Sequence, residues 1–197
     1  MTGGTRDLLL LVYTPREDSN QRGYEDWLRT IDNPFFNGVP GIRHYSNWKV
    51  MSPADCAFPY THFDLMFLAD AAAKDRVWSN PEVMTFAQGW TEKWGRYPRA
   101  TPETMHMNYS VFLCSTVAGD QRMAGRNLTI MPAKGPIAAP PGDQVYEIAE
   151  PVLGDVRFTH FALRYLPDGR AVDAATRPAG CYAAAQASLI AAPNRDR

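Results

Sequence analysis

Residues 61–70 read Thr61-His62-Phe63-Asp64-Leu65-Met66-Phe67-Leu68-Ala69-Asp70, and this stretch decides how the fold is interpreted. Successive side chains of a β-strand point to opposite faces, so residues two apart share a face. A strand over residues 60–70 therefore places Phe63, Leu65 and Phe67 on one face and His62 and Asp64 on the other. We expect the phenylalanines to pack on helices and the polar face to border a cavity.

A near copy, Thr159-His160-Phe161-Ala162-Leu163-Arg164, follows 98 residues later. Ala162 occupies the place that corresponds to Asp64, so His160 lacks a carboxylate two residues away. His160 is therefore interpreted as a structural or auxiliary pocket residue. Residues 118–197 form either a degenerate second half of a duplicated unit or an extension of the same compact unit that covers a pocket.

The composition indicates a folded, water-soluble chain. Hydrophobic residues make up 45% of the 197 residues, which is enough for a sizeable core, and 20 basic residues nearly balance 21 acidic ones. Without a basic stripe we expect no nucleic-acid partner. No apolar run reaches the roughly 18 residues of a membrane span, and no signal peptide is evident, so we expect no membrane association and a cytoplasmic location. Cys56, Cys114 and Cys181 are scattered, which favours buried free thiols over disulfides or a metal site.

The hydrophobic pattern predicts the element order β-α-β-β-α-β over residues 7–117. Tyr24, Trp27, Leu28 and Ile31 have helical spacing, and Asn80-Pro81 is typical of the start of a second helix. Strands are expected at 7–15, 42–51, 60–70 and 105–117, further strands at 144–148 and 156–166, and a closing helix at 181–191. This order predicts an α+β fold of ferredoxin-like type, an antiparallel sheet with both helices on one face.

Several segments also resemble the dimeric α+β barrel proteins. They are Tyr24-Glu25-Asp26-Trp27-Leu28-Arg29, Asp32-Asn33-Pro34, Gly38-Val39-Pro40-Gly41-Ile42, Phe63-Asp64-Leu65-Met66-Phe67 and Ser79-Asn80-Pro81-Glu82. Similar members include REDY-like and EthD-like proteins, small quinone-forming monooxygenases, muconolactone isomerase and polyketide cyclases. The resemblance covers residues 7–117 and implies two sheets packed face to face across a homodimer. It also implies a ligand pocket beside the sheet and catalysis without a metal or organic cofactor.

The strand faces supply the candidate catalytic residues His62, Asp64 and His106. A carboxylate beside an imidazole raises its pKa and fixes its tautomer, which suits a general acid or base. His106 shares a predicted strand face with Asn108 and could protonate or hold an oxyanion. Both faces could equally be polar surfaces that contact water.

Six further residues are candidates for substrate binding: His44, Trp48, Tyr13, Asn108, Tyr45 and His160. We expect three strands to bring His44, His62 and His106 near Asp64. Because these histidines lack the short spacings of metal ligands, no metal is expected.

We therefore predict a cofactor-independent enzyme that performs acid/base chemistry, of lyase, isomerase or cyclase type. Its substrate would be a small hydrophobic aromatic or phenolic molecule. The alternatives are a cofactorless monooxygenase of a phenolic substrate and a non-catalytic protein that binds a reactive intermediate.

Overall fold

The computed structural model describes residues 5–52, 58–119, 125–155, 157–166 and 177–193. Eight antiparallel strands form one closed barrel in the order β1-β3-β2-β8-β5-β7-β6-β4, and β4 pairs with β1 to close it. The strands are β1 (Arg6–Tyr13), β2 (Ile42–Ser52), β3 (His62–Leu68), β4 (Tyr109–Ala118), β5 (Asn127–Ala133), β6 (Gln144–Leu153), β7 (His160–Tyr165) and β8 (Ala185–Ala191).

This closed barrel shows that the expected fold, a ferredoxin-like sheet of dimeric α+β barrel type, is wrong. The order of elements over residues 6–118 is the expected one, but the sheet does not end at β2 and β4. β8 pairs with β2 and β6 pairs with β4, so residues 118–197 supply four strands that close the sheet on itself. The face expected to need a second chain is covered by the same chain.

The first four and the last four strands are arranged around the barrel in the same relative order. The order β4-β1-β3-β2 is followed by β8-β5-β7-β6, so that β1 corresponds to β5, β2 to β6, β3 to β7 and β4 to β8. His62 at the start of β3 and His160 at the start of β7 occupy corresponding positions. In each case the preceding threonine hydroxyl lies about 3 Å from Nδ1 of the histidine, at 2.9 Å for Thr61 and 3.0 Å for Thr159. The repeated segment in the sequence therefore marks two equivalent strands of one barrel.

The barrel interior is packed with side chains from all eight strands. Trp48 and Phe63 stack inside it with ring planes 6° apart, and Phe112, Ile130 and Phe161 complete much of the core. Small residues on β8, Ala185 and Ala187, also point inward. Inward-facing residues fill an eight-stranded barrel of this kind, so the interior is the main core.

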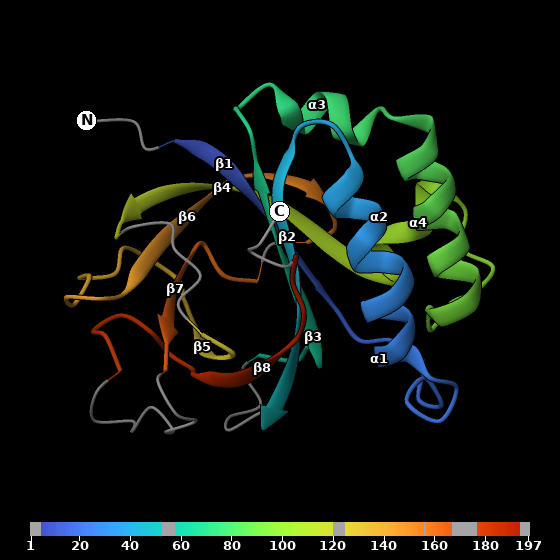
Figure 1. The fold of residues 1–197 in the computed structure, drawn as a ribbon. Helices are drawn as coiled ribbons and strands as arrows, with labels where there is room; N and C mark the ends of the chain where they lie inside the picture. The colour runs from blue at the N-terminus through green and yellow to red at the C-terminus, as the bar shows by residue number, and fades with distance from the viewer. Residues whose placement is uncertain (1–4, 53–57, 120–124, 156, 167–176, 194–197) are drawn as a thin grey trace.

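The helices lie on one side of the barrel, against β1–β4 (Figure 1). They are α1 (Tyr24–Trp27), the π-helix η1 (Leu28–Asp32), α2 (Asn33–Gly38), α3 (Ala73–Trp78), α4 (Pro81–Trp94) and the 3₁₀-helix η2 (Pro102–Met107). Asn80 caps α4 by accepting a hydrogen bond from the backbone N–H of Glu82 at 2.9 Å. A second apolar cluster, with Leu9, Met66 and Trp94 among its members, fills the space between these helices and the sheet.

The faces of β3 are the reverse of those expected. Phe63, Leu65 and Phe67 point into the barrel, whereas His62 and Asp64 lie on the side that the helices cover. All seven residues of β3 are buried, because the barrel core covers one face and the helices cover the other.

Two other segments also differ from expectation. Residues 102–107 form η2, so β4 begins only at Tyr109, and residues 185–191 form β8 where a closing helix was expected. Cys114 and Cys181 are free and buried, as expected, and Cys56 lies outside the described residues.

Candidate active site

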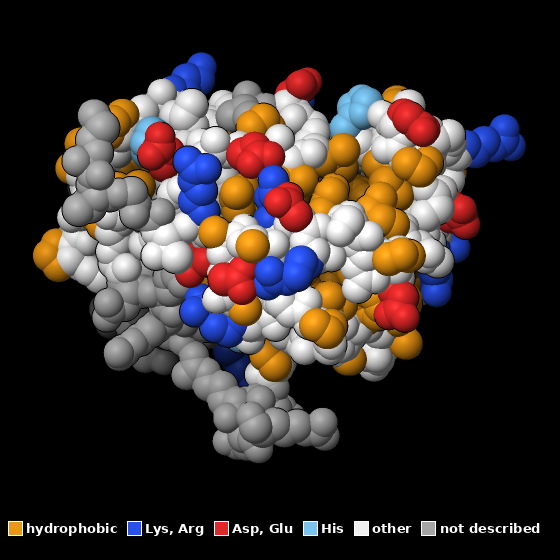
Figure 2. All heavy atoms as spheres, turned by 90° about the horizontal axis from the view of Figure 1, so that it is seen from above, with side chains coloured by type: hydrophobic (Ala, Val, Ile, Leu, Met, Phe, Trp, Pro, Cys, Tyr) orange, Lys and Arg blue, Asp and Glu red, His pale blue; other side chains and the backbone are white. Residues whose placement is uncertain are grey.

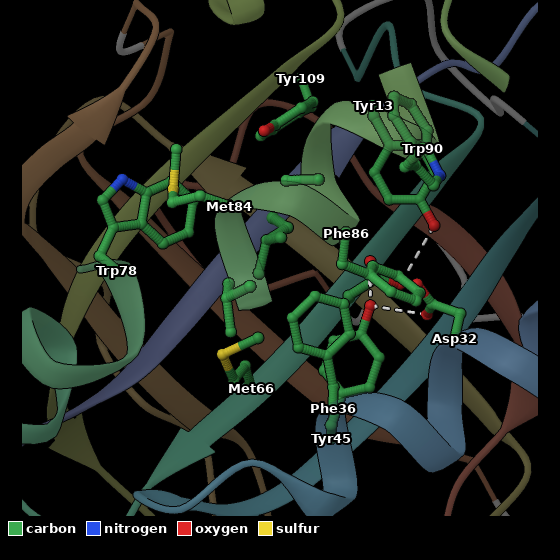
Figure 3. A pocket seen from close by; sticks show the side chains of 14 residues that line it. Tyr13, Asp32, Phe36, Tyr45, Met66, Trp78, Met84, Phe86, Trp90 and Tyr109 are labelled. Carbon is green, nitrogen blue, oxygen red and sulfur yellow. Dashed lines mark hydrogen bonds between the residues drawn. The ribbon is translucent and has the colours of Figure 1, made fainter. Parts of the chain in front are cut away.

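A pocket lies between the outer face of β1–β4 and helix α4, and we call it the helix-side pocket. Its apolar walls come mainly from α2, α3 and α4, and strands supply its polar floor (Figure 3). Its lining residues are Leu11, Tyr13, Asp32, Phe36, Tyr45, Asp64, Met66, Trp78, Val83, Met84, Phe86, Ala87, Trp90 and Tyr109. The space between atoms is about 550 Å³ counted out to its mouth, but the centre of a water molecule can reach only about 50 Å³ of it. The pocket is therefore narrow and suits a small apolar group.

Two buried aspartates, Asp32 and Asp64, form the polar end of the pocket, and we call them the carboxyl pair. Asp32 ends the π-helix, and Asp64 is in the middle of β3; each is 3% exposed. The Tyr45 hydroxyl lies 2.8 Å from Asp64 Oδ2 and 3.0 Å from Asp32 Oδ2. Asn47 Nδ2 donates to Asp32 Oδ2 at 2.9 Å and to Asp64 Oδ1 at 3.0 Å.

The surrounding side chains fix the orientation of these donors. Asn33 Nδ2 donates to Asn47 Oδ1 at 2.9 Å, which directs the amino group of Asn47 toward the carboxyl pair. Tyr13 donates its hydroxyl hydrogen to Asp64 Oδ1 at 3.1 Å. Burial strongly raises the pKa of both Tyr13 and Tyr45, and nearby Asp64 and Asp32 add to the increase. Both phenols therefore remain protonated donors at neutral pH.

The geometry favours a proton on the carboxyl pair. A tyrosine hydroxyl has one hydrogen to donate, yet the Tyr45 oxygen lies within hydrogen-bond distance of both carboxyls. The second contact becomes a hydrogen bond only if a carboxyl is protonated and donates to the Tyr45 oxygen. Two ionised carboxylates this close would also repel each other strongly in a buried site.

The pKa directions agree with this assignment. Burial raises the pKa of Asp32 to about 7, against the opposing effect of hydrogen bonds from Asn47 and Tyr45. Burial, together with the charge of Asp32, holds the pKa of Asp64 well above its usual range. Among the described residues, no lysine, arginine or histidine forms an ion pair with either carboxyl. Asp32 thus titrates near neutral pH and its titration is coupled to that of Asp64, and a group that titrates near neutral pH suits general acid/base chemistry.

His62 lies behind Tyr13 and outside the lining of the pocket. Its ring stacks on Tyr13 with centroids 5.6 Å apart, and its edge contacts Tyr24. Burial lowers the pKa of His62 to about 4, and its Nε2 atom is buried without a hydrogen-bond partner. Although His62 and Asp64 share a strand face, no hydrogen bond joins them; Asp64 is bound by tyrosine and asparagine instead.

The other candidates from the sequence lie apart from the carboxyl pair. His106 is exposed on η2, where its Nδ1 contacts the carbonyl of Glu103 at 3.2 Å. Asn108 donates to the Tyr97 carbonyl and accepts from the Tyr97 N–H. Trp48 lies inside the barrel, where it donates to Ser46 Oγ at 3.0 Å. The expected convergence of histidines near Asp64 is therefore not found.

His44 and His160 are half-buried at other places on the barrel. His44 is at the start of β2 with its ring edge toward Phe67, and His160 begins β7. Of the nine candidates, Asp64, Tyr13 and Tyr45 line the pocket together. Sequence reasoning missed Asp32 and Asn47; the signal for Asn47 was its position two residues after Tyr45 on the same strand face.

Within the described part of the chain, no group of three or more histidine, cysteine, aspartate or glutamate side chains is arranged to bind a metal ion. Among the same residues, no helix is long and apolar enough to cross a membrane. Comparisons with models of protein families, with curated proteins and with solved structures find no match to this chain.

Proposed function

We propose that the protein is a cofactor-independent enzyme that performs acid/base chemistry, of lyase, isomerase or cyclase type, on a small aromatic molecule. The observation that carries this proposal is the pair of buried carboxyls, joined through Tyr45 and Asn47, at the floor of an apolar pocket. An apolar cavity with a few convergent polar groups and shifted pKa values is a typical enzyme site.

The reaction would use the two carboxyls in complementary roles. The ionised member accepts a proton from an acidic O–H or C–H group of the substrate, and the protonated member returns a proton to another atom. The Tyr45 hydroxyl touches both carboxyls and provides a route for the proton between them. Positioned general acid/base groups typically contribute factors of about 10² to 10⁴ to a rate.

The experiment follows proton exchange on a flat bicyclic ketone, 2-tetralone, in deuterated buffer. Loss of the signal from its acidic C1 hydrogens is measured by proton NMR with and without protein. We expect the wild type to accelerate exchange, and Asp64→Asn and Asp32→Asn to reduce the acceleration at least about tenfold. Asp70→Asn, which changes an exposed aspartate paired with Arg76, is the matched control and should exchange like the wild type.

The second candidate is a non-catalytic binding protein. The narrowness of the pocket and the tight hydrogen bonding of the carboxyl pair favour it, because both suit rigid retention of a ligand. Binding of the ketone, seen as quenching of tryptophan fluorescence from Trp78 and Trp90 in the pocket wall, without accelerated exchange would support this candidate and contradict the enzyme.

A further inference from the structure

One carboxylate oxygen at the polar end of the pocket has no partner. Both hydrogen bonds of the Asp32 side chain, from Tyr45 and Asn47, are made by Oδ2. Among the described residues no donor reaches Asp32 Oδ1, although the residue is 3% exposed and lines the pocket. This oxygen is not among the buried side-chain atoms that lack a partner, so it opens to the pocket and can accept a hydrogen bond from a ligand.

The donors around the carboxyl pair are already engaged. Tyr13 and Tyr45 direct their hydroxyls at the carboxyls, and Trp90 donates its indole N–H to the Tyr24 hydroxyl at 3.0 Å. Figure 3 shows the Tyr13 and Tyr45 hydroxyls directed toward the polar end beside Asp32. A ligand at this end must therefore bring its own hydrogen.

The charge of the site favours a cationic donor. With one shared proton the carboxyl pair carries a negative charge, and no cation among the described residues is paired with it. Aromatic faces surround this end: Phe36 lies 4.7 Å from the Tyr45 ring, and the Tyr13 ring meets Trp90 edge-on at 5.3 Å. Such faces attract cations, whereas a carboxylate or phosphate ligand would be repelled by the pair.

We propose that the helix-side pocket takes an arylalkyl amine, a ring that carries its amino group on a CH₂ unit, whose protonated nitrogen donates to Asp32 Oδ1. This assignment rests on the same pocket as the proposed function and narrows its substrate class. The ring occupies the pocket between α4 and the sheet, and the ammonium group lies against the carboxyl pair. Binding of the cation replaces the shared proton as the positive charge at the pair.

The surface on the helix side of the molecule is partly apolar and carries charges of both signs (Figure 2). Seen from above, hydrophobic side chains gather on the side of the molecule where the helices lie (Figure 2). Lysine and arginine side chains on this face are interspersed with aspartate and glutamate. This face therefore shows no concentration of positive charge that would repel an amine.

The test compares three ligands that share one ring system and differ in charge. They are 2-(aminomethyl)naphthalene, 2-(hydroxymethyl)naphthalene and 2-naphthoate, and binding to the full chain is measured by titration calorimetry at pH 8. We expect the amine to bind about tenfold or more tightly than the alcohol, and the carboxylate to bind weakest. Repeating the amine titration in buffers of different ionisation enthalpy should show proton release.

Two variants separate a direct contact from a general effect. Asp32→Asn should remove the advantage of the amine over the alcohol, while affinity for the alcohol changes by less than about threefold. Phe36→Leu, which leaves the carboxyls intact, should weaken the amine more than the alcohol, and Asp70→Asn should change neither. Circular dichroism shows whether each variant is folded. If Asp32→Asn does not fold, the amine assignment is judged from the affinities of Phe36→Leu and from the order in which the wild type binds the three ligands.

Any of four results would overturn the amine assignment. The alcohol binds as tightly as the amine or more tightly, the carboxylate binds tightest, or none of the three ligands binds. The fourth is that folded Asp32→Asn still prefers the amine over the alcohol as the wild type does. These results leave the acid/base function standing if 2-tetralone exchange still depends on Asp32 and Asp64. Conversely, amine binding without any exchange activity keeps this assignment and contradicts the enzyme.

Discussion

Asp32 lies in a buried site where its hydrogen bonds do not offset the loss of water, and this makes the stability of the protein depend on pH. The unfolded chain releases the Asp32 proton near pH 4, whereas the folded protein keeps it until about pH 7. The contribution of this group is therefore most favourable at low pH and is lost as pH rises through about 7.

We expect Asp32→Asn to relieve this loss. The free energy of unfolding of the variant, minus that of the wild type, should increase between pH 4 and pH 7 by on the order of 2–4 kcal/mol and then level off. Urea denaturation at a series of pH values measures the difference. A difference that stays constant over this range would show that Asp32 ionises normally in the folded protein.

His62 should give the opposite dependence. Its pKa falls from 6.5 to about 4 because burial disfavours the charged ring, so the folded protein resists a proton that the unfolded chain binds. Stability from this residue is complete above pH 6.5 and is lost as pH falls toward 4. Between pH 7 and pH 4 the free energy of unfolding of His62→Gln should therefore fall by about 3 kcal/mol less than that of the wild type, as measured by urea denaturation. Equal falls in the two proteins would contradict the lowered pKa of His62.

At the residue scale, the sequence predicts a site residue where the alternation within a single strand indicates it. The alternation within residues 61–70 predicts Asp64 as a site residue, and Tyr13 and Tyr45 are candidates because a phenol can donate a hydrogen bond or stack on a ligand. Asp32 is not predicted, because the candidate catalytic residues come from strand faces and Asp32 lies on none of them.

At the scale of elements, the π-helix η1 decides where Asp32 lies. A π-turn contains more residues per turn than an α-helix, and such turns are often found at functional sites. Here the Leu28–Asp32 segment ends with Asp32 buried against Tyr45 and Asn47, while Thr30 remains exposed.

Deleting Thr30 should convert η1 to α-helical geometry and rotate Asp32 away from Asp64. We expect 2-tetralone exchange to fall at least about tenfold, with circular dichroism close to that of the wild type. Thr30→Ala is the matched control, since it removes only the hydrogen bond from the Thr30 hydroxyl to the Asp26 carbonyl. Equal activity of the deletion variant and this control would show that the π-turn does not position the carboxyl pair.

The alanine-rich segment that becomes β8 illustrates why some elements could not be predicted. Alanine has the highest helix propensity, so residues 181–191 were expected to be helical. Pairing with β2 and β5 overrides that preference, and the small side chains of Ala185 and Ala187 fit the crowded barrel interior. Such tertiary pairing leaves no local signal in the sequence.

At the scale of the whole molecule, the closed barrel changes which face of the first sheet is available. The alternation in β3 showed correctly that two faces differ, but not that the last four strands would cover the phenylalanine face. The expected homodimer came from the resemblance to dimeric α+β barrel proteins and stays a prediction, since the closed barrel does not require a partner for its core.

Closure within one chain predicts unfolding that is independent of protein concentration. If the barrel core is complete in one chain, the midpoint of urea unfolding should stay the same between about 1 and 100 μM protein. A midpoint that rises with concentration would show that association of chains contributes to the stability of the fold.

The central claim is that Asp32 and Asp64 hold a shared proton at neutral pH. Carbon-13 NMR of protein labelled at the aspartate carboxyls measures this directly, with Asp32→Asn and Asp64→Asn to assign the two signals. We expect one carboxyl to titrate near pH 7 and the other to remain protonated beyond it, while exposed aspartates such as Asp70 ionise below pH 5. Complete ionisation of both Asp32 and Asp64 by pH 5 would contradict the claim.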